Sequence, residues 1–286
     1  MMVPGDTVTE DWDLEFGGLA LGEGTPFLVA LVEGLADLPA VRSGDQTLLR
    51  TDGLWAGEDF LGGRTITISV EVDQRTTTTA FDQLAAAFVP GQAEQPLVMQ
   101  IPRVAGGTKV RVNARARRRS APINLEWLYD LPVIVVELDA TDPRIYADTP
   151  TSVSGLGLAA ATGGLTWPLT WPLDWGTFNS GTFTAFNGGN YATPVAFTFS
   201  GPLERPRVEN LTQSRTLEFD VSLAAGDTLV VDTGARTALV GGTASRSGTM
   251  TAGSEWFLLG AGTETIRFAA NSGTGTLAAE WRSAWI

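Results

Sequence analysis

The chain has 286 residues, 43% of them hydrophobic and 18% charged, with 33 glycines and 15 prolines, a composition typical of a folded, turn-rich protein long enough for two domains. It contains no cysteine and no histidine, which excludes disulfides and thiol nucleophiles and removes the commonest general base and zinc ligand. The formal charge of −13 is uneven, because residues 1–99 carry 4 Arg against 16 acids whereas residues 100–120 carry 7 Lys and Arg and no acid.

The N-terminal residues 1–16 are acidic where a secretory signal would be basic and apolar, and no window has the length of apolar sequence that a membrane span needs. We therefore expect a soluble protein that is made in the cytoplasm and does not contact a membrane. An acidic chain with one basic stripe favours self-association over general nucleic-acid binding.

The first half of the chain alternates strand patterns with one helical pattern. Residues 64–73 place apolar and polar side chains on opposite faces, which predicts a half-buried strand. Residues 80–88 form one apolar helical stripe, with Thr79 as the expected N-cap and a Pro-Gly stop after it. Further strands are expected at 97–103, 108–119 and 131–140, the last with a nearly continuous apolar run typical of a strand covered on both faces.

These patterns predict an α+β split-barrel domain over residues 1–147. The sequence then becomes rich in Pro, Gly, Ser, Thr and Ala up to residue 164, which indicates a connection between packed units. Residues 148–286 contain short strands separated by glycine turns and no amphipathic helix, which predicts an antiparallel β-sandwich or jelly roll. Its strands are expected at 193–201, 215–223, 228–233, 236–240, 255–259, 264–270 and 276–286.

The segment TWPLTWPLDW, residues 166–175, repeats a Trp-Pro-Leu unit. Two prolines exclude a helix, because each would remove a backbone hydrogen bond and clash with the preceding turn. At a period of two, Trp167, Trp171 and Trp175 share one face with two leucines. Our first interpretation is an edge strand whose aromatic face is a wall of the core. The second is an exposed stacking platform for a sugar or a neighbouring protein.

The strand expected at 108–119 is the most polarised feature of the sequence. Period-two alternation places its cations on one face and small apolar residues on the other until Arg118 breaks the pattern. This face is either a solvated surface or a site that docks on the acidic surface of a neighbouring copy. Binding to DNA is a weaker alternative, because no aromatic residues are interleaved for stacking. The candidate interface residues are Lys109, Arg111, Arg115, Arg117 and Arg119.

No motif carries catalytic or cofactor chemistry. GLGLAA at 155–160 matches a lone G-x-G-x-x-A, but no strand precedes it as nucleotide binding requires. Asp11 and Asp13 lack the extended ligand spacing of a calcium loop. We therefore expect no catalytic residue, no cofactor and no metal site, and a protein that binds rather than turns over a substrate.

Several stretches resemble the distal tail proteins of long non-contractile-tailed bacteriophages. They are LPVIVVELDATDPRIYA (131–147), GGNYATPVAFTFSGPLERPRVEN (188–210), AGDTLVVDTGARTALV (225–240), and the C-terminal region 254–286 that begins SEWFLLGAGTETIRF and ends WRSAWI. The resemblance covers most of the chain and is one of overall pattern, since none of these strings is a catalytic signature.

This resemblance implies a belt domain at 1–147 that forms a hexameric ring, and a galectin-like sandwich at 148–286. The protein would be a virion component, a tail-tip adaptor joining the tail tube to the baseplate or tail-tip hub. The implied partners are other copies of the chain, the tail tube protein and a hub or tail-associated protein, with the tape-measure protein a further candidate. A galectin's sugar site relies on a histidine, which this chain lacks. The alternative function is a carbohydrate-binding accessory tail protein that contacts the host surface.

Overall fold

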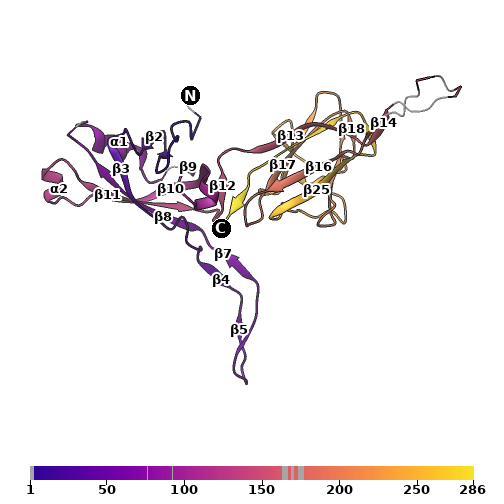
Figure 1. Ribbon diagram of the computed structural model, residues 1–286. Coiled ribbons are helices and arrows are strands. Elements are labelled where there is room, and N and C mark those ends of the chain that lie inside the picture. The colour runs from indigo at the N-terminus through magenta and orange to yellow at the C-terminus, as the bar shows by residue number, and fades with distance from the viewer. Residues whose placement is uncertain (1–2, 76, 92, 163–166, 169–170, 173–176) are drawn as a thin grey trace. The chain divides into compact units, whose positions relative to one another are not determined.

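A computed structural model describes residues 3–286 apart from 76, 92, 163–166, 169–170 and 173–176. The chain divides into two compact units, Met1–Thr149 with Trp285–Ile286, and Pro150–Ala284. Antiparallel strands dominate both units (Figure 1), so the predicted mainly-β fold class is confirmed. Within the described part of the chain, no helix combines the length and apolar character that crossing a membrane would require.

The first unit is built on one antiparallel sheet with the strand order β2-β1-β9-β10-β11-β8-β3. A short strand near the end of the unit, β12, pairs with both β10 and the C-terminal β28. The strands are β1 (Leu14–Phe16), β2 (Leu19–Leu21), β3 (Phe27–Glu33), β8 (Arg64–Val72), β9 (Gln95–Met99), β10 (Val110–Ser120), β11 (Val133–Ala140), β12 (Ile145–Ala147) and β28 (Ala284–Trp285).

One face of this sheet, the inner face, closes the first core. Helix α1 (Ala80–Ala87) contributes Ala80 and Leu84 to it, together with the helix-terminal Phe88, which stacks on Phe16. The predicted strand at 64–73 and helix at 80–88 are thereby confirmed, although the Thr79 side chain makes no capping hydrogen bond. The short α2 (Leu125–Leu128) lies in the connection between β10 and β11.

Strand β11 corrects one prediction, because it is not covered on both faces. Ile134, Val136 and Leu138 are fully buried, whereas Val133 and Val135 on the other side remain partly exposed. β-Branched residues favour the extended backbone even on a half-exposed face, so an apolar run need not indicate two covered faces. The side of the sheet that carries Val133 and Val135 is called the outer face.

The second unit is an antiparallel β-sandwich, as predicted. One sheet has the order β13-β27-β17-β22-β23-β24 and the other β16-β25-β19-β20. Phe199 of one sheet and Phe268 of the other meet in the core with ring centroids 5.9 Å apart. The strands are β13 (Thr151–Gly157), β16 (Thr182–Asn187), β17 (Val195–Ser200), β19 (Arg207–Asn210), β20 (Arg215–Glu218), β22 (Thr228–Asp232), β23 (Thr237–Val240), β24 (Ala244–Ser245), β25 (Gly262–Ala269) and β27 (Thr276–Trp281).

Shorter strands complete this unit. β18 (Leu203–Glu204) lies between β21 (Ser222–Leu223) and β26 (Ser272–Gly273), while β14 (Ala160–Thr162) pairs with β15 (Thr177–Asn179). The strand predicted at 255–259 is wrong, since only Leu259 forms an isolated bridge there. Phe257 and Leu259 are nevertheless buried in the core, so their apolar character reflects a packed loop.

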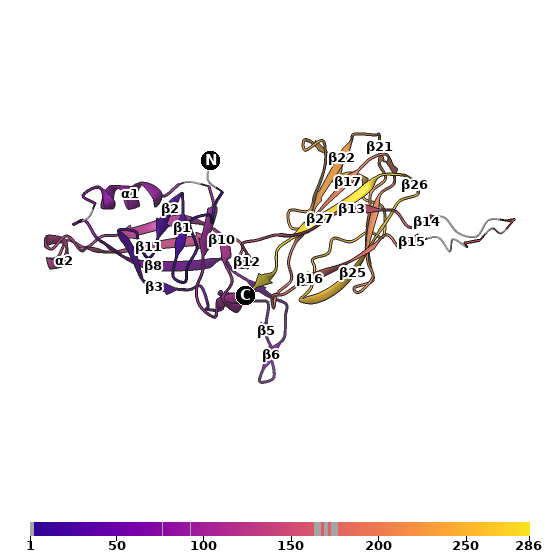
Figure 2. The ribbon, with the colours of Figure 1, turned by 45° about the horizontal axis from the view of Figure 1, so that its top comes forward.

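Between β3 and β8 the chain forms a two-stranded ribbon, residues 38–61, which we call the arm (Figures 1 and 2). Near the sheet β4 (Val41–Ser43) pairs with β7 (Asp59–Leu61), and farther out β5 (Gln46–Thr47) pairs with β6 (Leu54–Trp55). The two halves join where Gly44 and Gly57 face each other. A Cβ atom at Gly57 would overlap the Gly44 carbonyl, so the close approach requires glycine.

Arg64, the first residue of β8, fixes the base of the arm. Its side chain is buried with 2% exposure. Nη1 donates hydrogen bonds to the carbonyls of Gly34, Leu35 and Asp37 at 2.7 to 2.8 Å, and Nε donates to Pro143 at 2.8 Å. Burial lowers the pKa of Arg64 from its ordinary value. The guanidinium thus ties the segment leading into the arm to the start of β8.

Candidate functional site

The predicted basic strand is β10, and a β-bulge divides its cations. The pairing of β10 with β11 shifts register between Ala116 and Arg118. One extra residue at this point exchanges the two faces of the strand. Arg115 and Arg117 lie on the outer face before the bulge, and Arg118, opposite Glu137, lies there after it.

Arg119 therefore does not share a face with Arg115 and Arg117, which corrects the sequence prediction. Its Nη1 donates to the carbonyl of Ala85 in α1 at 2.7 Å, and its guanidinium carbon lies 5.9 Å from the centre of the Phe81 ring. Both contacts hold the helix on the inner side of the sheet. The break in alternation at Arg118 was the sequence signal of the bulge, and period-two counting through it assigned Arg119 to the wrong face.

Lys109 and Arg111 are also engaged within the unit. Lys109 Nζ donates to the Gly5 carbonyl at 2.7 Å. Arg111 donates from Nε and Nη2 to a carboxylate oxygen of Asp148, at 2.9 and 2.6 Å, and both side chains of this ion pair are mostly buried. These cations attach the N-terminal segment and the end of the unit to β10, and a surface role is left to the remaining arginines.

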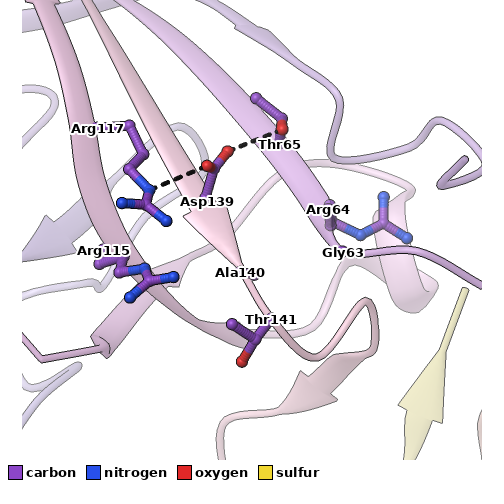
Figure 3. A pocket seen from close by; sticks show the side chains of 8 residues that line it. All are labelled: Gly63, Arg64, Thr65, Arg115, Arg117, Asp139, Ala140 and Thr141. Carbon is purple, nitrogen blue, oxygen red and sulfur yellow. Dashed lines mark hydrogen bonds and ion pairs between the residues drawn. The ribbon is translucent and has the colours of Figure 1, made fainter.

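Arg115 and Arg117 line a hollow of about 410 Å³ on the outer face, which we call the basic hollow (Figure 3). Asp139 on β11 accepts from Arg117 Nε at 3.1 Å and from Thr65 Oγ1 at 2.8 Å, so both of its oxygens are engaged. Arg115 Nε is buried and has no hydrogen-bond partner among the described residues. The guanidinium groups of Arg115 and Arg117 against the one carboxylate of Asp139 leave the hollow with net positive charge.

A second hollow of about 220 Å³ follows along the same face beyond the bulge. Arg118 and Ser120 of β10 and Val135 and Glu137 of β11 line it. Val135 forms an apolar wall of this second hollow, and Arg118 and Glu137 supply opposite charges. The outer face of β10 and β11 thus presents two neighbouring hollows whose arginines can accept carboxylates from another molecule.

Trp167 and Trp171, the described tryptophans of the segment, do not form a wall of the core. Trp167 and Trp171 are each 86% exposed and lie in bends of the connection between β14 and β15, and Trp175 lies outside the described residues. Phenylalanines such as Phe197, Phe199 and Phe257 fill the sandwich core instead. Period-two alternation identified a common face but could not tell whether a sheet was present to cover it. The two described tryptophans fit the second interpretation, an exposed aromatic surface.

Sequence patterns alone did not identify the arm. Both of its halves are exposed along their length, and they carry large apolar side chains, including Trp55 at 73% and Leu49 at 97% exposure. The signal was present, because Thr51-Asp52-Gly53 is a turn sequence flanked by short apolar stretches of matching length. The described carboxylates, here and elsewhere, form no group of three or more that could hold a metal ion.

The chain is similar to known phage tail proteins both in the sequence of its second unit and in its fold. Residues 188–285 match the family model described as siphovirus-type tail component, C-terminal domain. The fold resembles the crystal structure of SPP1 Dit (gp 19.1), which is described as a paradigm of the hub adsorption apparatus in phages infecting Gram-positive bacteria. That similarity has a TM-score of 0.64 at 11% sequence identity and covers 96% of this chain and 99% of the other. No curated protein matches the sequence.

Proposed function

We propose that this chain, whose fold resembles that of SPP1 Dit and whose residues 188–285 match a siphovirus-type tail component, is a Dit-like phage tail protein that forms a tail-tip adaptor ring. The ring would join the tail tube of a long non-contractile-tailed phage to the baseplate or tail-tip hub. Its function would be attachment, with neither a catalytic residue nor a cofactor. It would act in the virion after synthesis in the host cytoplasm.

The fold similarity over both units supports this proposal most directly. It extends through 96% of the chain, so the first unit and the sandwich occur together in SPP1 Dit as they do here. A ring needs a surface on each copy that recognises another copy. The basic hollow, lined by Arg115 and Arg117, offers such a surface on the first unit. The 16 acids of residues 1–99 supply its complement.

We propose a closed, six-membered ring as the assembled form. In a closed ring each copy is held on two sides, so contacts that are individually weak suffice. The other partners are the tail tube protein on one side and the tail-tip hub or tail-associated protein on the other. The tape-measure protein is a further candidate partner.

The test is assembly of the purified full chain, measured as native mass and imaged by negative stain. We expect six-fold rings, and we expect the double variant Arg115→Glu with Arg117→Glu to weaken assembly in a salt-sensitive manner. Arg236→Glu with Arg246→Glu, two arginines of the second unit, is the matched control for charge. A wild-type chain that remains monomeric and does not bind tail tube would contradict the proposed function.

The exposed Trp167 and Trp171 favour a second candidate function, carbohydrate binding at the host surface. Aromatic side chains presented to solvent can stack on sugar rings. A carbohydrate-binding accessory protein would be retained on host cell-wall polysaccharide, and Trp167→Ala with Trp171→Ala would abolish the retention. Equal retention of the wild type and this variant would remove the observation that favours the second function.

A further inference from the structure

The arm is a two-stranded ribbon that exposes several large apolar side chains. Its two pairs of short strands have no third strand among the described residues. Isolated two-stranded ribbons are marginal in water, and contiguous exposed apolar side chains on a folded protein mark interaction sites. The exposed apolar residues are Leu38, Val41, Leu48, Leu49, Leu54, Trp55 and Phe60.

The arm is nevertheless built to hold a defined shape. The buried Arg64 fixes its base through three carbonyls of residues 34–37. At the mid-point, the Gly57 N–H donates to Asp45 Oδ1 at 2.8 Å, and this bond lowers the pKa of Asp45. Gly44 N donates to the Glu58 carbonyl at 3.1 Å. These contacts keep the ribbon extended away from the sheet, so it is preorganised to bind something outside its own unit.

The net negative charge of the arm favours a partner surface that is positively charged. Its carboxylates outnumber its arginines, and the side chains of Asp52, Glu58 and Asp59 make no hydrogen bond or ion pair with any described residue. In the register of β4 and β7, Asp59 lies beside Ser43 next to the apolar pair Val41 and Leu61. This combination of apolar side chains and unpaired carboxylates complements the outer face of β10 and β11, where Arg115 and Arg118 line the two hollows and pair with no carboxylate among the described residues.

We propose that the arm of one copy docks on the outer face of β10 and β11 in a second copy. The carboxylates of Glu58 and Asp59 would pair with Arg115 and Arg118, and the apolar side chains of the arm would cover Val135. The inference rests on the proposed ring and specifies the contact that builds it. Arm and receiving face are different surfaces of one unit, so the contact is heterologous. It repeats from copy to copy and closes a ring when the rotation permits.

Cysteine cross-linking tests this contact directly, because the chain has no cysteine of its own. Thr47→Cys labels the exposed outer half of the arm, and Thr141→Cys labels the rim of the basic hollow. Full-length chains that each carry one of these changes, with different tags, are mixed and treated with a short bis-maleimide. We expect covalent heterodimers of the two tagged chains. A cysteine at the exposed Ala252, in the second unit, replaces Thr141 in the control for random collision.

Charge reversal provides an independent measurement on the same mixture. Arg115→Glu with Arg118→Glu in one chain, or Glu58→Arg with Asp59→Arg in the other, should lower the cross-linked yield about tenfold, because like charges then face each other. Combining both reversed chains should restore the yield, which a simple loss of folding could not do.

The native mass of the wild type, measured in parallel, separates the two proposals. Wild-type rings without the cross-link above the Ala252 control would overturn the inference and leave the proposed function standing. Failure of the combined reversed chains to recover the cross-linked yield would overturn the inference in the same way. A wild-type chain that stays monomeric and does not bind tail tube would overturn both.

Discussion

Replacing Arg64 by Met tests whether the buried guanidinium holds the base of the arm. The side chain contacts four carbonyls, three of them through Nη1 and in residues 34–37. Because Nη1 carries only two hydrogens, these contacts amount to three full hydrogen bonds, which contribute about 4.5 kcal/mol at about 1.5 kcal/mol each, the low end for charged donors. Removing a buried charge also relieves a desolvation cost of several kcal/mol, and methionine retains part of the packing. We expect a net loss of about 3 kcal/mol in the free energy of unfolding of the first unit.

Differential scanning calorimetry provides the measurement. A loss of about 3 kcal/mol corresponds to a decrease of about 6 to 12 °C in Tm for a unit of this size. The transition of the second unit should remain in place and serve as the internal reference. Arg42→Met, on the exposed β4, is the matched control and should change stability by less than about 0.5 kcal/mol. A change for Arg64→Met as small as that of Arg42→Met would refute the assigned role of Arg64.

Two further predictions concern the buried Tyr146 and the exposed Trp167 and Trp171. Tyr146 is mostly buried and donates to Asp142 Oδ2 at 2.6 Å, and burial raises its pKa. Because the folded state holds the phenol proton more tightly, the free energy of unfolding of the first unit should fall as pH rises above about 10. Urea titrations at several pH values should show a smaller fall with pH for Tyr146→Phe. An unchanged pH dependence in this variant would contradict the role assigned to Tyr146. Trp167→Ala with Trp171→Ala should leave the unfolding free energy within about 0.5 kcal/mol of wild type, because both side chains are exposed; a large loss would restore the core interpretation.

The sequence predicted the elements whose pattern depends only on local periodicity. The strand at 64–73 and the helix at 80–88 appear as β8 and α1, because alternation and the 3.6-residue stripe report which side chains face a core. Alternation could not predict that Arg64 is buried, because its burial depends on carbonyls at 34–37 and 143. Long-range pairing of this kind is not visible in a window of ten residues.

The wrong predictions for the tryptophans and for Arg119 also arose because long-range contacts are not visible in local alternation. The tryptophan segment alternates as a strand would, yet its burial depended on whether a sheet lay beside it. Along β10, alternation was correct up to Arg117 and wrong at Arg119, because the bulge reverses the faces. Five cations that look equivalent in the sequence therefore divide into three that hold the unit together, Lys109, Arg111 and Arg119, and two that line the basic hollow.

The C-terminal residues make a fragment of the first unit unsuitable for testing the contact between the arm and a second copy. Trp285 belongs to the first unit, packs against its core and lies in β28, which pairs with β12. A truncation after residue 149 would remove this side chain and expose the apolar surface that it covers. Lost assembly in such a fragment could then reflect damage to the first unit. The contribution of the arm is therefore measured more cleanly in the full chain, by Gly57→Val. This change places a side chain against the Gly44 carbonyl and leaves both cores intact.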